Sequence, residues 1–474
     1  MSNSTEQFKP ILSFESIFSF VGINSIFKKA GFIKRSGASV EDLFLTLVSS
    51  VFYGNKNLFR LFSSPIGKAK DFGKDALYRM CAKPKYNWQY LLFQLAVFAI
   101  TFIHSLNNGS KDTVNCLVVD DTMIERSRGK KVELLSRQFN HVIGKTVKGF
   151  TNLSLGWTDG ISFIPVLNYL IASAKEKNQI MPDKTKGKSR KECGVDKRTN
   201  AGKLRNIAVK TKPDVLIDMV KKAVKLIPAQ YILMDSWFFS DCLIKQLYDL
   251  GLNTICLVKS NLQFRTLDAP DTPLTQKQLL KKLCNGKLRN ANTLTSAIVI
   301  TNQGTKVKVV LVKSYNSKDV IAIVSTDLSL SDEEIIRIYG FRWNIEVNFK
   351  IQKQYLGLKT ECQCRDFNSC NAFMITANIR YLFIELNRRH DNDPRGHGEI
   401  FCTVKSEMLV IPFLKVLQHL LQLIDSIVDR LDEAGCLKSN CRDVAKQVIS
   451  DLIEEWYAEV TDYVKQFFSL PSPT

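Results

Sequence analysis

Residues 231–260, YILMDSWFFSDCLIKQLYDLGLNTICLVKS, decide the fold class of this chain. The stretch begins with a short run of apolar, strand-forming residues that stops at Asp235. An amphipathic segment follows, with Ser240 in the position of a helix N-cap and Gly251 at its end, and a second apolar strand comes next. Because residues 212–227 also have the pattern of an amphipathic helix, the alternation predicts a partly parallel sheet covered by helices.

Further strand signals lie upstream of this stretch. Residues 116–122, CLVVDDT, are an apolar run that is stopped by acids. Residues 148–173 contain two strand-like runs separated by Asp159-Gly160, and Asp-Gly is a signal of a hairpin turn. The fold class is therefore predicted as α/β, with a mixed sheet that is flanked by helices.

The chain has a different character after these strands and at its two ends. Residues 296–326 hold three strand-like runs separated by polar turns, which predicts an all-β insertion at about residues 261–328. Residues 1–112 and 390–474 are predicted to be mostly helical. Helical regions are therefore expected before and after the sheet.

The 474-residue chain has a net charge of +20 at pH 7, from 66 Lys and Arg against 46 Asp and Glu. This excess indicates an anionic partner, most simply nucleic acid, although an unspecialised basic surface gives the same charge. The cations are dense between Lys175 and Lys212, where thirteen Lys and Arg stand against four acids. We expect this segment, with Lys197 and Arg198 in it, to contact phosphates rather than to be only a solvated loop.

The expected location is the cytoplasm, with no membrane partner. The first residues are polar and lack the apolar core of a signal peptide. The most apolar stretch, 88–106, is interrupted by Gln89, Gln94 and His104, which favours a buried helix over a membrane span. Twelve cysteines without framework spacing indicate reduced thiols.

The N-terminal region contains a candidate DNA-reading motif. After Gly73, a short polar and basic helix is predicted to begin at Lys74, to include Arg79 and to end before Pro84. A helix, a turn and a second basic helix are the parts of a helix-turn-helix reader, although any helical bundle has such turns. Lys74 and Arg79 are therefore candidate contacts to DNA.

Residues 331–358 are predicted to form one helix that carries its charges on a single face. Ser331 and Glu334 have the spacing of a capping box at its start. At about 100° per residue, a phenol, an acid and three cations fall within an arc of about 80°. These side chains are Tyr339, Arg342, Glu346, Lys350 and Lys353. The alternative interpretation is a ladder of ion pairs on a solvated surface.

Two strand-end acids favour a catalytic interpretation of this helix. Asp120 and Asp235 are each the first charged residue after a buried strand, where sheets position functional groups. Together with Glu346 they make a set of carboxylates that suits hard divalent cations. Two such ions can activate a water or hydroxyl and stabilise the leaving oxygen in phosphodiester cleavage. The cations of the helix would then hold the phosphates.

The spacing Y-x2-R-x3-E-x6-K, which Tyr339, Arg342, Glu346 and Lys353 fulfil, resembles a transposase signature. It is similar to that of the bacterial insertion-sequence transposases of the DDE type, in the branch typified by insertion sequence four. The resemblance extends to VVDDT, MDSWF and YLGL and covers roughly residues 114–389. It implies a ribonuclease H-like core, a β-rich insertion, two Mg²⁺ or Mn²⁺ ions, and cut-and-paste transposition of double-stranded DNA.

The resemblance also implies roles for individual residues. Asp120, Asp235 and Glu346 are the implied metal ligands and catalytic residues, with Asp121 as the alternative to Asp120. The implied contacts to transposon-end DNA are Tyr339, Arg342, Lys350 and Lys353.

The parts of the chain receive roles in the same way. Residues 1–112 are expected to bind the DNA ends, 113–389 to be the catalytic domain, and 390–474 to contribute to a homodimer in the DNA complex. Two alternatives to a bacterial transposase stay open. One is a ribonuclease H-like endonuclease that cuts without joining, and the other is a DNA-binding protein without catalysis.

Overall fold

The computed structural model describes residues 14–106, 113–140, 143–284, 293–313, 320–390, 392–438 and 441–459. The chain divides into two compact units. The first contains residues up to 398 except 52–54, and the second contains 52–54 with the residues from 399 onward. The predicted boundary at residue 112 and the predicted turn at 316–318 lie outside the described residues. The division into three domains therefore stays a prediction.

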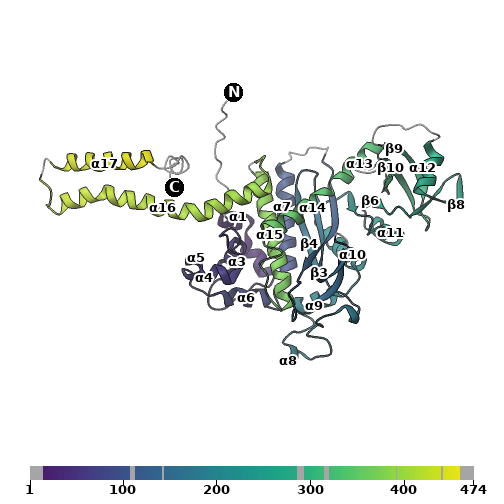
Figure 1. Cartoon of the computed structure of the whole chain (residues 1–474), viewed down its shortest axis with the longest axis horizontal. Coiled ribbons are helices and arrows are strands. Elements are labelled where there is room, and N and C mark those ends of the chain that lie inside the picture. Colours follow the sequence, from purple (N-terminus) through teal and green to yellow (C-terminus); the bar gives the residue numbers. More distant parts are fainter. Residues whose placement is uncertain are drawn as a thin grey trace, which may run out of the picture. The chain divides into compact units, whose positions relative to one another are not determined.

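A mixed sheet forms the centre of the first unit (Figure 1). Its core strands are β1 (Cys116–Glu125), β2 (Ser136–Asn140), β3 (Lys145–Thr158), β4 (Phe163–Ile171), β5 (Tyr231–Met234) and β6 (Asn253–Val258). Strands β1, β3 and β4 pair antiparallel in the order β4-β3-β1, and β5 and β6 follow parallel to β1. The predicted α/β class is confirmed, and this order is consistent with a ribonuclease H-like fold.

Helices cover both faces of this sheet. Figure 1 shows α7 (Trp88–Leu106) and α15 (Phe367–His390) on one side of β3 and β4, and α10 (Lys212–Ala223) on the other. Helix α11 (Asp241–Asp249) connects β5 to β6, and the Ser240 side chain caps it as predicted. The Asp159-Gly160 turn joins β3 to β4, also as predicted.

Helix α7 is long and apolar enough to cross a membrane by length and composition. It packs against β4 and α15, however, and residues such as Leu91, Leu95 and Ile103 are buried. The Gln89 side chain is buried as well and hydrogen-bonds the backbone of Asn168 in β4. These contacts account for the apolar sequence as that of a core helix.

The insertion after β6 differs from the all-β prediction. It contains strands β7 (Gln263–Thr266), β8 (Ala269–Thr275), β9 (Thr293–Ile300), β10 (Lys306–Lys313) and β11 (Val320–Ser325), but also helix α12 (Gln276–Cys284). The sequence of α12 is rich in Lys, Gln and Leu, which are good helix formers. Strand β11 pairs with β6, so the insertion continues the central sheet and produces eleven strands in total.

The remaining helices belong to three regions of the chain. The N-terminal region consists of α1 (Phe14–Val21), α2 (Ile23–Lys29), α3 (Val40–Ser49), α4 (Leu58–Ser63), α5 (Pro65–Lys68) and α6 (Lys74–Ala82). The basic segment between β4 and β5 contains η1 (Glu176–Asn178), α8 (Arg190–Cys193) and α9 (Asn200–Ala208). The second unit consists mainly of α16 (His397–Glu433) and α17 (Arg442–Glu459).

Candidate active site

Asp120 and Asp235 lie at the same level of the sheet. Strands β1 and β5 run parallel, with Val118 opposite Leu233. Asp120 lies two residues after Val118 within β1, and Asp235 lies two residues after Leu233, directly after the end of β5. Since side chains alternate between the two faces of a strand, both carboxylates project from one face. The charge on Asp235 acts on Asp120, as expected for neighbours on adjacent strands.

The segment that carries the third acid is two helices and not one. Helix α13 (Asp332–Gly340) ends before Arg342, and α14 (Trp343–Gln354) begins after it. Between them, the backbone N–H of Phe341 bonds Ile338 O and that of Arg342 bonds Tyr339 O, three residues back in each case. The single-helix prediction, with five side chains on one arc, is therefore wrong in its geometry. The capping box of Ser331 and Glu334 is confirmed.

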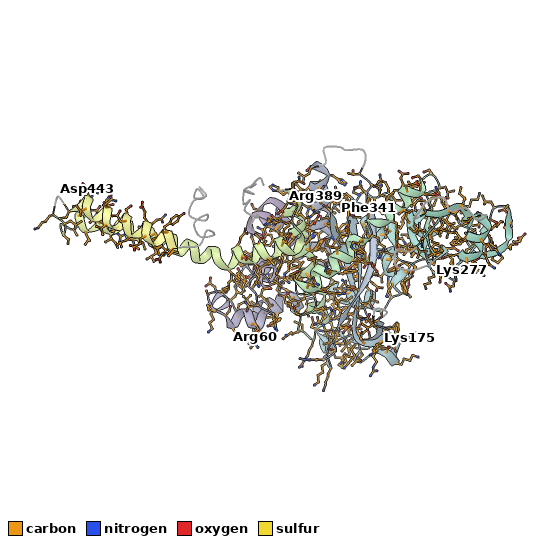
Figure 2. The ribbon with its side chains drawn as sticks, turned by 45° about the horizontal axis from the view of Figure 1, so that its top comes forward. Arg60, Lys175, Lys277, Phe341, Arg389 and Asp443 are labelled. Atoms are coloured by element: carbon orange, nitrogen blue, oxygen red, sulfur yellow. The ribbon has the colours of Figure 1, made fainter. Side chains whose placement is uncertain are left out.

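The turn between the helices packs on the β3–β4 hairpin. The Phe341 ring lies so close to Gly160 that a Cβ on this glycine would be 2.7 Å from it. Arg389 of α15, labelled with Phe341 in Figure 2, forms an ion pair of 3.3 Å with Asp159 in the same hairpin. The Asn344 side chain donates to Thr158 Oγ1 at 3.1 Å. These contacts fix the start of α14 against the sheet.

Arg342 joins two of the three predicted catalytic acids. Its Nη1 donates to Asp120 Oδ2 at 2.9 Å, and its Nη2 donates to Glu346 Oε1 at 2.5 Å. The guanidinium is largely buried, with 14% of its side chain exposed. Two carboxylates that are 226 residues apart in sequence thus converge on one cation, and Asp235 completes the set from the adjacent strand.

Burial controls the electrostatics of this cluster. It raises the pKa of Asp120 to about 7, against the opposing effects of Arg342 and of a hydrogen bond from the Asp121 backbone N–H. Burial also raises the pKa of the Tyr339 phenol, whose hydroxyl has no hydrogen bond within the described part of the chain. A site with this environment requires positive charge to keep its carboxylates ionised.

Asp121 lies on the face of β1 opposite to Asp120, where it forms an ion pair with Lys212. Its Oδ2 accepts a bond of 2.5 Å from the Nζ of Lys212, the first residue of α10. The same ammonium lies 4.3 Å from the centre of the Trp237 ring, which is 40% exposed. Asp120, and not Asp121, is therefore the acid that shares a cation with Glu346.

The predicted DNA-contacting residues of α14 differ in their environment. Lys353 donates to Thr122 Oγ1 of β1, and burial lowers the pKa of this lysine. Lys350 is exposed, and so is Trp343, at 63%. Lys353 is therefore held beside Asp120 on the sheet, whereas Lys350 and Trp343 are accessible to a ligand.

The other predicted contacts lie apart from the carboxylates. Lys74 begins α6 as predicted, and it lines a cavity of about 500 Å³ whose other residues come from α4, α5 and the loop after them. Arg79 is exposed on the same helix. Lys197 is exposed as well, while Arg198 forms a surface ion pair of 2.8 Å with Asp196.

Sequence reasoning missed two residues of the site, Lys212 and Thr122, and gave no structural role to Arg205. The sequence places Lys212 at the end of the basic segment and at the start of an amphipathic helix, and Thr122 in the VVDDT motif, but neither position shows that the side chain lies beside Asp120 or Asp121. Arg205 has a fully buried side chain. Its spacing on α9, three residues before the buried Ala208, was a weak signal of an inward position.

The three carboxylates fit a divalent cation in their chemistry. Hard cations prefer the oxygen ligands that Asp120, Asp235 and Glu346 supply. Among the described residues, however, no group of three His, Cys, Asp or Glu side chains is arranged to hold a metal ion. Arg342 explains this at the present site, because its guanidinium bonds both Asp120 and Glu346. Cation binding here requires Arg342 to release at least one of these acids.

Comparison with known proteins gives one family match. A family model described as DDE superfamily endonuclease matches residues 63–312, which is more than half of the chain. The match contains Asp120 and Asp235 and ends before Glu346. A search of curated proteins finds no match.

Proposed function

The chain belongs to the DDE superfamily endonucleases, and from this premise we propose that it is the transposase of a bacterial insertion sequence. It would cut double-stranded DNA at terminal inverted repeats and join the released ends to target DNA. The observation that carries the proposal is the Arg342 bridge between Asp120 and Glu346, with Asp235 in register on the adjacent strand. The Y-x2-R-x3-E-x6-K spacing supports a transposase over other nucleases of this family.

Asp120, Asp235 and Glu346 would hold two divalent cations, Mg²⁺ or Mn²⁺. When bound, such ions supply activation of a water or 3′-hydroxyl and stabilisation of the leaving oxygen. The chain's own residues prepare the site. Arg342 neutralises the acids until DNA and cations enter, and its guanidinium is then free to bind a phosphate bidentately.

The surrounding residues hold the DNA strand. Lys353, fixed on Thr122, places a positive charge beside Asp120. The exposed Lys350 and Trp343 offer a phosphate contact and a stacking surface one turn or less from Glu346. Tyr339 is enclosed and is not positioned as a nucleophile, so no covalent protein–DNA intermediate is invoked.

Two copies of the protein are proposed to act together, one at each DNA end. The residues from 399 to the end contain twelve acids and seven Lys or Arg, so this region is not suited to bind DNA. Its helices expose apolar side chains, which suits contact with a second copy. The reaction is proposed to take place in the bacterial cytoplasm.

The direct test is cleavage and joining of the DNA that flanks the coding region. Wild-type protein is expected to cut this DNA with Mg²⁺ or Mn²⁺ and to join a pre-cleaved end to a target plasmid. Asp235→Asn should reduce both reactions to background and leave DNA binding nearly unchanged. Asp249→Asn, which removes an exposed acid at the end of α11, is the matched control and should retain activity.

The outcomes separate the proposal from its rivals. Cutting without joined product would show an endonuclease and would exclude the transposase. DNA binding without cutting in any divalent cation would show a silent DNA-binding protein. Full activity of Asp235→Asn would show that the reaction does not need the Asp235 carboxylate and would contradict the proposed mechanism.

A further inference from the structure

A second feature of the first unit is a basic cavity of about 630 Å³ that the catalytic residues do not line. Its lining includes three acids, Glu133, Asp183 and Asp366, and a larger number of cations, Lys131, Lys184, Lys186, Lys188 and Arg365, and we name it for the excess of these cations. The cations come from three separate segments, which are the loop after β1, the basic segment after β4, and the loop directly before α15. The loop that carries α8 extends away from the sheet below α9 (Figure 1). The basic cavity is thus built by the tertiary fold and not by one run of lysines.

Arg205 of α9 holds the three segments together. Its Nε and Nη2 donate to the two carboxylate oxygens of Glu133 at 2.9 and 2.8 Å. The same guanidinium forms longer ion pairs with Asp183 at 3.5 Å and Asp366 at 3.6 Å. Because the Arg205 side chain is fully buried, these acids must face inward to neutralise it.

The inward acids determine where the neighbouring cations lie. Each acid belongs to a different segment of the basic cavity and stands within two residues of one of its cations. The pairs are Lys131 with Glu133, Asp183 with Lys184, and Arg365 with Asp366. The fold therefore turns the acids toward Arg205, with Glu133 6%, Asp183 20% and Asp366 23% exposed, and leaves the more exposed cations at the rim.

Three of the rim cations are available to a ligand. Lys184 forms an ion pair with Asp366 at 2.7 Å, and Lys186 forms one with Glu176 at 2.6 Å. Lys131, Lys188 and Arg365 are exposed, and none of them forms an ion pair with an acid of the described chain. Like charges gathered in this way repel one another unless an anion lies between them.

The arrangement fits an extended polyanion better than a small one. The buried guanidinium is already used by carboxylates, so no buried donor is left for a free phosphate inside the cavity. The available cations lie at the rim, where successive phosphates of a nucleic-acid backbone can reach them. Such a distribution of charge suits contact with the phosphates of a nucleic acid and does not require contact with its bases.

The basic cavity also lies within reach of the catalytic acids along β1. The strand carries Asp120 and ends at Glu125, and the chain reaches Lys131 six residues later. At about 3.3 Å per residue, Arg126 is about 20 Å from Asp120. Arg126 marks the near side of the cavity, because its side chain donates to Cys362 O, three residues before Arg365. This distance corresponds to about six base pairs of duplex DNA, or about half a helical turn.

We propose that the basic cavity binds the phosphate backbone of the cleaved DNA duplex about half a turn from the scissile bond. The inference rests on the proposed function, because it requires DNA at Asp120. It replaces Lys197 and Arg198 as the principal phosphate contacts of the basic segment. Arg205 is a positioning residue in this scheme, since it acts through the segments that it holds.

The test is the salt dependence of binding to a 30-base-pair duplex without divalent cations. Lys188→Ala/Arg365→Ala should lower the slope of log affinity against log salt by about 2, since each lost phosphate contact contributes about 0.9. The matched control is Arg430→Ala/Lys438→Ala, which removes one Lys and one Arg from exposed positions of the second unit. The control slope should equal that of the wild type.

The results distinguish this inference from the proposed function. Wild-type slopes in both double variants, or equal losses in both, would overturn the basic cavity as a contact and leave DNA binding intact. No binding of DNA by the wild type would overturn the proposed function as well. Duplexes that retain fewer than about six base pairs on one side of the cleavage point locate the contact. Two such duplexes are used, each shortened on a different side of the cleavage point. The difference in slope between variant and wild type should vanish with one of the two, and its persistence with both would overturn the half-turn placement.

Discussion

Arg342 shows how one side chain can stabilise a site that contains two partly buried acids. Asp120 and Glu346 would repel each other and lose hydration if no cation lay between them. The guanidinium offers two donors in a fixed geometry, which a lysine cannot match. The same property allows it to exchange one carboxylate for a phosphate. The residue therefore connects the stability of the empty fold with the proposed binding of DNA.

Arg342→Ala is expected to destabilise the first unit by about 1–3 kcal/mol, because it leaves two acids without their partner. Added Mg²⁺ should raise the melting temperature of this variant more than that of the wild type, since a cation then replaces the guanidinium. Thermal unfolding, recorded without Mg²⁺ and then at Mg²⁺ concentrations that rise in 10-fold steps, measures both effects. Lys350→Ala, at an exposed position of α14, is the control and should behave as the wild type. An Mg²⁺ response of Arg342→Ala no larger than that of the wild type would contradict this account.

Arg205 illustrates a buried cation whose role is mainly architectural. Arg205→Met should reduce the free energy of unfolding by about 3–5 kcal/mol, because Glu133 loses both of its guanidinium bonds in a buried environment. Chemical denaturation measures the loss. Arg198→Met breaks a pair that is exposed to solvent and should leave stability unchanged within error. Similar stability of the two variants would show that the Arg205 network is dispensable.

At the scale of elements, local signals were sufficient for some parts of the fold. The Asp159-Gly160 turn and the Ser331 capping box depend on adjacent residues, and both were predictable from the sequence. The break between α13 and α14 was not, because the Phe341 contact with Gly160 depends on a hairpin that is distant in sequence. The inward position of Arg205 was hidden for the same reason, since a run of lysines and arginines does not show which member the fold will bury.

The capping box gives a prediction for α13, the helix that carries Tyr339. The Ser331 hydroxyl accepts the Glu334 backbone N–H at 3.2 Å, and the Glu334 carboxylate accepts the Ser331 N–H at 3.1 Å. Ser331→Ala should cost about 1 kcal/mol of stability, measured as a shift in the denaturation midpoint. Ser127→Ala, at an exposed loop position, should cost nothing measurable. Equal midpoints for the two variants would show that the cap does not limit stability.

At the scale of the whole molecule, the two units differ in charge. The chain carries a net charge of +20, yet its residues from 399 onward contain twelve acids and seven Lys or Arg. The positive charge is therefore concentrated in the unit that holds the carboxylates and the basic cavity. The region from residue 399 onward also exposes apolar side chains on both of its helices, such as Leu423 on α16 and Val448 on α17. This division of charge is consistent with the proposal that the first unit binds DNA and the second contacts another copy of the protein.

The contact between two copies is predicted to use the exposed apolar face of α16. Leu420, Leu423, Ile427 and Leu431 follow one another at intervals of three, four and four residues and are 40–50% exposed. Such spacing is that of a helix that packs against a partner helix. Within the same unit, Asp429 pairs with Arg442 at 2.7 Å and with Lys446 at 2.9 Å, so charged contacts join α16 to α17.

Leu423→Ser/Ile427→Ser should convert a dimer into a monomer, because it removes apolar area from the centre of this face. Light scattering after size exclusion, with and without DNA ends, measures the mass. Circular dichroism should show unchanged helix content, since both positions are exposed to solvent in the single chain. Gln422→Ser, at an exposed polar position of the same helix, should retain the dimer. A double variant with the mass of the wild type would place the contact elsewhere. A monomeric variant that still joins both ends would show that pairing of the ends does not depend on α16.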